Sequence, residues 1–129
     1  MAKTALDISK DQWRVYHPGA AMQRRRALTA HQTQARWEQA QHLARAAAQR
    51  LREEFGARRV VLFGSAVRPS SFTLWSDVDL AAWGIPPEHF YAAVAAVTSL
   101  STEIAVDLVD PEHCPAALQT VIEREGVEL

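Results

Sequence analysis

The pair Asp77 and Asp79 is the first feature of the sequence that could support chemistry. Two residues apart on a strand, these side chains project from the same face, with their backbones roughly 7 Å apart. Carboxylates held so close raise each other's pKa unless a cation lies between them. A hard divalent ion relieves the repulsion, and Mg²⁺ is the usual ion near phosphates. The pair alone is weak evidence, because such spacing is common and often marks only a loop end and a solvated strand residue.

Asp107 strengthens the prediction of a metal site. Aspartate is disfavoured inside strands, yet Asp79 lies between Val78 and Leu80, which are typical core residues. Asp107 has the same setting, between Val106 and Leu108. Aspartates on strand faces that could converge are costly for folding, and function is the usual compensation. We therefore interpret Asp77, Asp79 and Asp107 as candidate catalytic and metal-binding residues.

Gly64 and Ser65 follow an apolar run and could bind phosphate. Glycine lets the backbone approach a ligand closely. Exposed amides at a strand-to-loop transition, with a serine hydroxyl, can donate to phosphate oxygens. Arg68 could add its fork of donors, although a solvated loop arginine is an equally good interpretation. Alone, Gly-Ser is usually only a turn.

The apolar periodicity predicts the elements that must position these residues. A helix is expected over 30–55, and Gly56 is a suitable stop. The run 59–63 is apolar without alternation, as in a strand buried on both faces. Residues 66–76 are expected to be a loop with at most a turn of helix. The helix has an apolar stripe formed by Trp37, Ala40, Ala44, Ala47, Leu51 and Phe55.

The second half of the chain predicts two further strands and two further helices. Strands are expected over 77–83 and 103–109, and a helix near 87–100. Asp110-Pro111 is predicted to begin the last helix, which Gly126 would end. The order α-β-β-α-β-α indicates an α/β (α+β) fold, a small mixed sheet with packed helices. The apolar faces predicted for the two helices consist of Phe90, Val94, Val97 and Leu100, and of Leu118, Val121 and Ile122.

Composition narrows the class of protein. The chain has 129 residues, with 14 basic and 15 acidic side chains, so no basic surplus favours nucleic acid as a direct partner. Its one cysteine, Cys114, excludes an intrachain disulfide and is expected to be a small helix residue. There is no signal-like segment and no run long enough to span a membrane, so a cytoplasmic location is expected.

Residues 1–28 are predicted to form an N-terminal arm, and 29–129 the domain that carries the candidate site. The arm contains Trp13, Tyr16, the segment His17-Pro18-Gly19, which is predicted to be a turn, and the basic triplet Arg24-Arg25-Arg26. Its aromatic residues indicate packing, either on the chain's own domain or on a partner.

Together these segments resemble the minimal nucleotidyltransferases of the DNA polymerase β-like superfamily. The resemblance extends from about residue 35 to the end, including Arg124-Glu125-Gly126-Val127, and each segment is weak without the others. The combination of segments, in this order and at this spacing, is specific. The resembling segments are Val60-Val61-Leu62-Phe63-Gly64-Ser65-Ala66-Val67-Arg68, Ser76-Asp77-Val78-Asp79-Leu80 and Val106-Asp107-Leu108-Val109.

The resemblance implies a polymerase β-like nucleotidyltransferase fold and a Mg²⁺-dependent enzyme. Asp77 and Asp79 would bind two Mg²⁺ ions that also hold a triphosphate, and Asp107 would share the catalytic ion and help deprotonate the acceptor hydroxyl. Gly64 and Ser65 would hold the β- and γ-phosphates. The nucleotide would be ATP and the product an adenylylated acceptor.

The family also implies a partner. Minimal nucleotidyltransferases often pair with a helical HEPN-domain protein as antitoxin and toxin, and can attach AMP to a tyrosine of that toxin, so a hetero-oligomer or homo-oligomer is compatible with the resemblance. Two alternatives stay open: transfer to a small molecule, as in antibiotic nucleotidyltransferases, and an inactive subunit that masks a helical partner. Small-molecule enzymes of this kind usually carry an acceptor domain, and none is recognised here.

The sequence departs from the family pattern after Gly64-Ser65. The second glycine is missing, because the loop reads Ala66-Val67-Arg68-Pro69. The spacer to Asp77 is about one residue longer than usual and contains Phe72, Leu74 and Trp75. These apolar side chains are unusual for a loop in solvent: they could pack on the domain itself, stack on the nucleotide base, contact a partner or reflect a different substrate.

Overall fold

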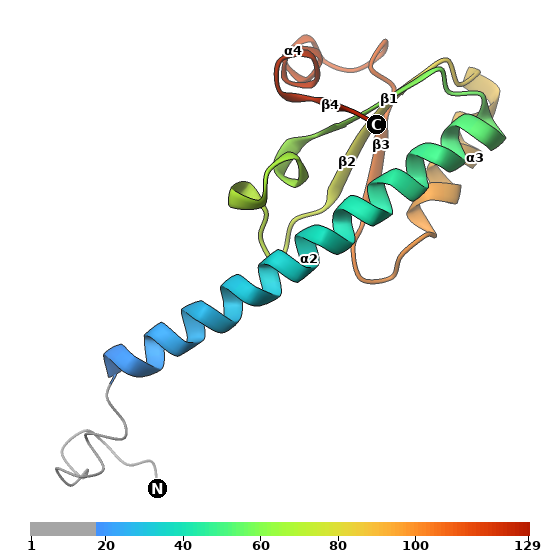
Figure 1. Ribbon diagram of the computed structural model, residues 1–129. Helices are drawn as coiled ribbons and strands as arrows, with labels where there is room; N and C mark the ends of the chain where they lie inside the picture. The colour runs from blue at the N-terminus through green and yellow to red at the C-terminus, as the bar shows by residue number, and fades with distance from the viewer. Residues whose placement is uncertain (1–17) are drawn as a thin grey trace, which may run out of the picture. The chain divides into compact units, whose positions relative to one another are not determined.

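The computed structural model describes residues 18–129, and the chain divides into two units, Met1–Gln32 and Thr33–Leu129. The protein is a small α+β protein with a long N-terminal helix, a four-stranded mixed sheet and two further helices (Figure 1). The elements are α2 (Pro18–Phe55), β1 (Arg59–Phe63), the 3₁₀ turns η2 (Gly64–Val67) and η3 (Pro69–Ser71), β2 (Val78–Trp83), α3 (Pro87–Thr98), β3 (Val106–Val109), α4 (Ala116–Glu125) and β4 (Val127–Glu128).

The sheet has the strand order β3-β2-β1-β4. Strand β1 pairs antiparallel with both β2 and β4, whereas β2 and β3 run parallel. The register places Asp79 opposite Phe63 on one side and opposite Asp107 on the other. The mixed sheet expected from the sequence is therefore confirmed, with two of the aspartates on neighbouring strands.

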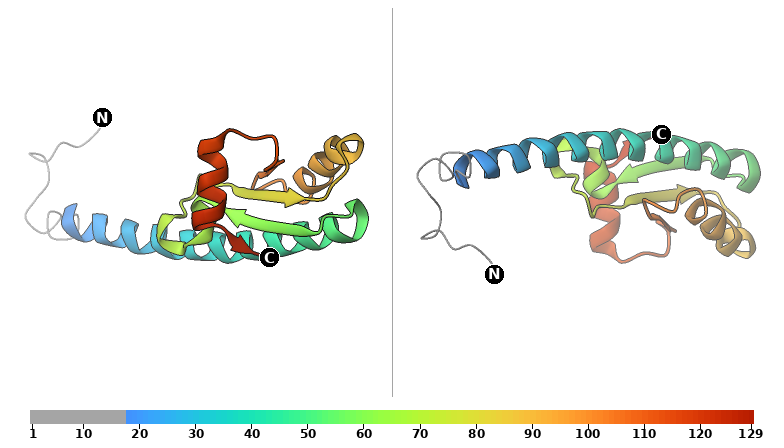
Figure 2. Two further views of the ribbon diagram at one scale, coloured as in Figure 1. Left: turned by 90° about the horizontal axis from the view of Figure 1, so that it is seen from above. Right: turned by 90° about the horizontal axis from the view of Figure 1, so that it is seen from below.

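One face of the sheet forms the main hydrophobic core with α2 and α3. Alternate strand residues such as Leu62, Leu80 and Val106 are buried there. The predicted stripe of α2 packs on this face, with Ala40, Ala44, Ala47 and Leu51 fully buried. Figure 2 shows the Thr33–Phe55 part of α2 on one side of the strands and α4 on the other.

The opposite face carries a smaller core that covers only part of the sheet. Val61, Phe63 and Ala81 pack there against Ile122 of α4. Because strand residues alternate between faces, Asp79 shares this face with Ala81, and Asp107 shares it with Val109. Asp79 and Asp107 therefore lie on the same face of the sheet, opposite the main core.

The ends of α2 agree with the prediction at one end only. The helix ends at Phe55. Gly56 follows in the left-handed region with φ of 75°, as expected for a terminating glycine. The helix begins at Pro18 instead of near residue 30, so Pro18 and Gly19 lie in its first turn and the predicted turn at this point is wrong. Proline is well tolerated there because its missing N–H has no helical partner anyway.

The predicted start of the last helix at Asp110-Pro111 is also wrong. Helix α4 begins at Ala116 after Pro115, because a second proline inside the first turns of a helix would remove a needed N–H donor. Asp110 instead accepts a hydrogen bond from the Glu112 N–H at 3.0 Å and so stabilises a turn. Cys114 lies in this turn and not in a helix.

The C-terminal segment adds a strand that the sequence did not reveal. Strand β4 is two residues long and pairs with Val61 and Leu62 of β1, too short to show any alternation. Gly126 ends α4 as predicted, and a Cβ at this position would collide with the Ile122 carbonyl and the Val61 side chain. Of the expected α4 face, Ile122 is buried, whereas Val121 is exposed. Within residues 18–129, no helix has the length and apolar character needed to cross a membrane.

Candidate functional site

Asp79 lies at the centre of the candidate site. It is half-buried near the beginning of β2 and is paired in register with Asp107, which is exposed on β3. Asp77 directly precedes β2 and is also half-buried. We refer to Asp77, Asp79 and Asp107 as the carboxylate site.

Electrostatics couples the three carboxylates. The pKa of Asp79 is raised to about 6, first because burial penalises its charged form, and then because Asp107 and Asp77 repel its charge. Both other aspartates therefore lie within electrostatic range of Asp79. A cation bound among them would remove the repulsion that raises this pKa.

The carboxylate site fits a metal in chemistry but is not a complete cage. Its oxygen donors are the type that Mg²⁺ prefers. Among residues 18–129, however, no three His, Cys, Asp or Glu side chains are arranged closely enough to hold a metal ion by themselves. Mg²⁺ usually keeps several waters and is bound through one or two carboxylates plus substrate phosphates. The donor set therefore fits an ion that arrives with a phosphate ligand.

Gly64 brings the η2 turn against Asp79. It follows Phe63, the residue paired with Asp79 across β1 and β2, and its φ of 76° is in the left-handed region. A Cβ at this position would lie 2.6 Å from the Asp79 Oδ2 atom. Glycine is therefore required here for both conformation and space. The structure thus brings the predicted Gly64-Ser65 segment and Asp79 together.

A surface pocket of about 350 Å³ lies at the η2 turn. Arg68 lines the pocket with Gly64 and Ser65, so the three residues predicted to bind nucleotide surround one space. Ser71 and Glu125 also line this pocket and were not identified from the sequence. The Ser71 hydroxyl, 3.0 Å from the Ser65 carbonyl and 3.1 Å from the Arg68 carbonyl, links the two turns.

Helix α2 contributes side chains that the sequence analysis missed. Trp37 Nε1 and Gln41 Nε2 both donate to the Ala66 carbonyl, at 3.0 and 2.7 Å. Arg36 donates to the carbonyls of Ser76 and Glu103, each at 3.2 Å. The only signal in the sequence was that polar residues lie beside the apolar stripe of the helix. Such residues are also typical of a helix side that simply faces solvent.

The loop before Asp77 is only partly exposed. Phe72 is 3% exposed and packs in the main core, so packing on the domain itself is the correct interpretation for this residue. Its burial follows from its place directly after η3, where an apolar side chain can turn into the core. Trp75, in contrast, is 83% exposed. Trp13 and Tyr16 lie outside the described residues.

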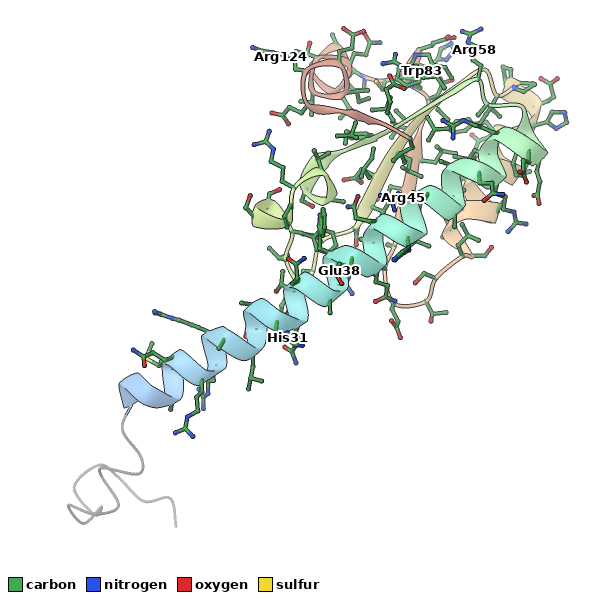
Figure 3. The ribbon with its side chains drawn as sticks, viewed as in Figure 1. His31, Glu38, Arg45, Arg58, Trp83 and Arg124 are labelled. Atoms are coloured by element: carbon green, nitrogen blue, oxygen red, sulfur yellow. The ribbon has the colours of Figure 1, made fainter. Side chains whose placement is uncertain are left out.

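A second pocket lies at the opposite end of β2 from Asp79, and Trp83 is one of its lining residues. Figure 3 shows Trp83 next to Arg58, where β1 and β2 meet. The Arg59 guanidinium lies 4.3 Å from the centre of the Trp83 ring and 2.5 Å from Glu128. These contacts stabilise this end of the sheet. This pocket lies away from the carboxylate site, whereas Gly64 of the η2 pocket lies next to Asp79, so the η2 pocket is the better candidate for phosphate binding.

The raised pKa of Asp79 predicts how the stability of the metal-free protein depends on pH. An acid whose folded pKa lies above its unfolded value binds protons more strongly when folded, so stability falls as pH rises. We expect the contribution of Asp79 to decline between about pH 4 and about pH 6, the window set by its ordinary pKa of 3.8 and its folded pKa of about 6. Urea unfolding with a chelator, compared with Asp79→Asn, measures this contribution. If the difference in unfolding free energy between the two proteins stayed constant across this pH window, the predicted contribution of Asp79 would be wrong.

Neither the known protein-family models nor the curated proteins contain a match to this chain. The resemblance to minimal nucleotidyltransferases therefore depends on the short segments around Gly64, Asp77 and Asp107. The functional proposal is supported by those segments together with the geometry around Asp79.

Proposed function

We propose that this protein is a Mg²⁺-dependent nucleotidyltransferase with a polymerase β-like fold, which transfers AMP from ATP to an acceptor hydroxyl. One observation carries the proposal. The η2 turn approaches Asp79 so closely that only glycine fits at position 64, and Asp79 is in register with Asp107 on the next strand. A phosphate-binding turn and paired carboxylates at one point are what transfer of a nucleotidyl group requires.

The chain's own residues would divide the work. Asp77, Asp79 and Asp107 would hold two Mg²⁺ ions, which when bound neutralise charge on the attacking and leaving oxygens. Gly64 and Ser65 would orient the β- and γ-phosphates. The acceptor oxygen forms a bond to the α-phosphorus, the bond to the bridging oxygen breaks, and pyrophosphate leaves. Asp107, the exposed carboxylate of the site, would accept the proton of the attacking hydroxyl.

Charge around the η2 pocket favours a nucleotide that arrives with its cation. Arg68 supplies a positive charge at the pocket, but Glu125 supplies a negative one. Free triphosphate would be repelled by Glu125 and by the carboxylate site. The Mg²⁺ complex carries less negative charge, and its cation is attracted to the same carboxylates.

The acceptor that we propose is a tyrosine of a HEPN-type helical protein. The exposed indole of Trp75, two residues before Asp77, provides an apolar contact beside the carboxylate site. Exposed tryptophan is a frequent anchor in protein interfaces. Its turn is ordered by hydrogen bonds, because the Thr73 N–H donates to Ser76 Oγ at 2.9 Å and the Trp75 N–H to Thr73 Oγ1 at 3.2 Å.

The test uses the full chain, the protein encoded by the neighbouring gene, ATP and Mg²⁺. We expect pyrophosphate release that requires Mg²⁺ and an increase in the intact mass of the neighbour by whole AMP units. Trp75→Ser should lower the rate of transfer to the neighbour about tenfold, the effect of losing an interface anchor. Its affinity for the Mg²⁺ complex of a non-hydrolysable ATP analogue should stay unchanged. Tyr91→Ser, another exposed aromatic residue, is the matched control.

Different failures point to different conclusions. Pyrophosphate release without a change in the neighbour's mass would leave the activity but reject this acceptor. A complex with the neighbour that forms without any pyrophosphate release would favour an inactive masking subunit. Absence of both nucleotide binding and release would reject the nucleotidyltransferase proposal.

A further inference from the structure

Two side chains of α2 hold the η2 turn by a single carbonyl. Trp37 Nε1 and Gln41 Nε2 donate to the Ala66 oxygen at 3.0 and 2.7 Å. Because a carbonyl oxygen has two lone pairs, each of them has a side-chain donor here. Ala66 is fully buried in the turn that contains Gly64 and Ser65. The orientation of the η2 turn is therefore fixed from α2, and not only by β1, which precedes it.

Arg36 holds the two loops that lead to the carboxylate site. Its Nη2 donates to the carbonyl of Ser76, the residue directly before Asp77, and its Nη1 to the carbonyl of Glu103, which precedes β3 and Asp107. Hydrogen bonds from a charged donor are stronger than neutral ones. One guanidinium thus links the loop before β2 with the loop before β3. The register of these two strands pairs Asp79 with Asp107.

These contacts differ from those of Gln34 and Gln49 on the same helix, which stay within the helix. Gln34 and Gln49 bond the glutamates four residues later, Glu38 and Glu53, at the exposed surface (Figure 3, where Glu38 is labelled). Arg36, by contrast, is partly buried and its Nε atom has no hydrogen-bond partner among the described residues. Burying an unsatisfied donor is costly. An ordinary packing position would be filled more favourably by an apolar residue.

We infer that Arg36, Trp37 and Gln41 are positioning residues with separate roles at the proposed site. Trp37 and Gln41 fix the orientation of the η2 turn and so control nucleotide affinity. Arg36 fixes the loops that precede β2 and β3 and so controls metal affinity. The inference rests on the proposed function for the ligands involved. The linkage between α2 and the three loops, however, is a structural statement that can be tested without any activity.

The experiment compares two variants. Trp37→Phe/Gln41→Leu removes both donors to Ala66 and retains apolar bulk. Arg36→Met removes the hydrogen bonds to Ser76 and Glu103 and retains the apolar stem of the side chain. Amide hydrogen exchange in the metal-free protein should accelerate at residues 64–67 in the first variant and at 76–79 and 104–107 in the second. Gln49→Leu and Gln39→Leu are the controls, because Gln39 bonds only the exposed Glu103 carboxylate at 2.9 Å.

Measured affinities for the ATP analogue and for Mn²⁺ then distinguish a positioning role from a general loss of structure. The first variant should weaken the binding of a non-hydrolysable ATP analogue with Mg²⁺ roughly tenfold, as the loss of one or two hydrogen bonds implies. Its affinity for Mn²⁺ alone should change little. Arg36→Met should show the opposite pattern, and Arg36→Lys, which retains a charged donor, should recover part of the metal affinity.

The outcomes are distinct. Equal loss of both affinities in the two variants, or exchange that accelerates throughout the sheet, would overturn the inference in favour of a general packing role. Locally accelerated exchange in the variants, with a wild-type protein that binds neither Mn²⁺ nor nucleotide, would support the linkage and reject the proposed function. If Arg36→Met does not fold, Arg36→Lys carries the test: one ammonium replaces the two nitrogens that bond Ser76 and Glu103, so exchange should still accelerate at 76–79 or at 104–107. Wild-type exchange at both segments would overturn the role of Arg36.

Discussion

Asp79→Asn is expected to lower nucleotide transfer by about 10³-fold, the effect of removing several kcal/mol of charge stabilisation. Asp79 is half-buried, lies next to Gly64 and is paired in register with Asp107. Asparagine retains the shape and one oxygen but removes the charge. The metal-free fold should therefore survive while the proposed binding of Mg²⁺ is lost.

The same substitution should stabilise the metal-free protein at pH 7. The pKa of Asp79 is about 6, so its carboxylate is charged at this pH despite burial and the repulsion of Asp107 and Asp77. The neutral amide avoids these costs, worth about 1 kcal/mol after allowance for solvent screening. This gain should be smaller at pH 4, where the carboxyl of the wild-type protein is protonated when folded.

Activity and stability should therefore change in opposite directions. The measurements are pyrophosphate release with Mg²⁺ and urea unfolding with a chelator, on the same preparations. Asp110→Asn is the matched control, because Asp110 follows β3 outside the carboxylate site and holds a turn through the Glu112 N–H. It should retain transfer. Normal Mg²⁺-dependent turnover of Asp79→Asn would show that the role assigned to Asp79 is wrong.

The sequence predicted the sheet and the position of Asp79 because strand periodicity depends only on local order. Alternation along 77–83 and 103–109 is sufficient to place Asp79 and Asp107 away from the main core. The sequence alone could not show that β2 and β3 are neighbours, nor the register that pairs Asp79 with Asp107. The fold class and the aspartate face were therefore predictable from the residues themselves.

The parts that were missed depend on contacts distant in sequence. Phe72 is buried because its loop folds onto the core, which no local pattern indicates. The roles of Arg36 and Gln41 depend on loops 25 to 67 residues away. The start of α4 is different, because Pro115 was visible in the sequence and its missing N–H should have excluded a helix from residue 111. The favourable cap at Asp110 does not outweigh the loss of the backbone donor at Pro115.

Gly64→Ala is expected to remove nucleotide transfer almost completely, by at least about 10²-fold, as misplacement of reacting groups by an ångström implies. A Cβ at this position would lie 2.6 Å from Asp79 Oδ2, so the carboxylate or the η2 turn must move. Either movement separates the phosphate-binding turn from the carboxylate site. The φ of Gly64 is 76°, in the left-handed region. An alanine in this region destabilises the folded backbone by on the order of 1–2 kcal/mol.

Gly56→Ala is the control that separates these two effects. Gly56 has nearly the same φ, 75°, but a Cβ there would meet nothing within 4 Å, and the residue lies at the end of α2. Both variants should lose similar stability from the backbone, as measured by urea unfolding, whereas only Gly64→Ala should lose transfer and analogue binding. If Gly64→Ala retained as much transfer activity as Gly56→Ala, the close contact between the η2 turn and Asp79 would not be needed for the reaction.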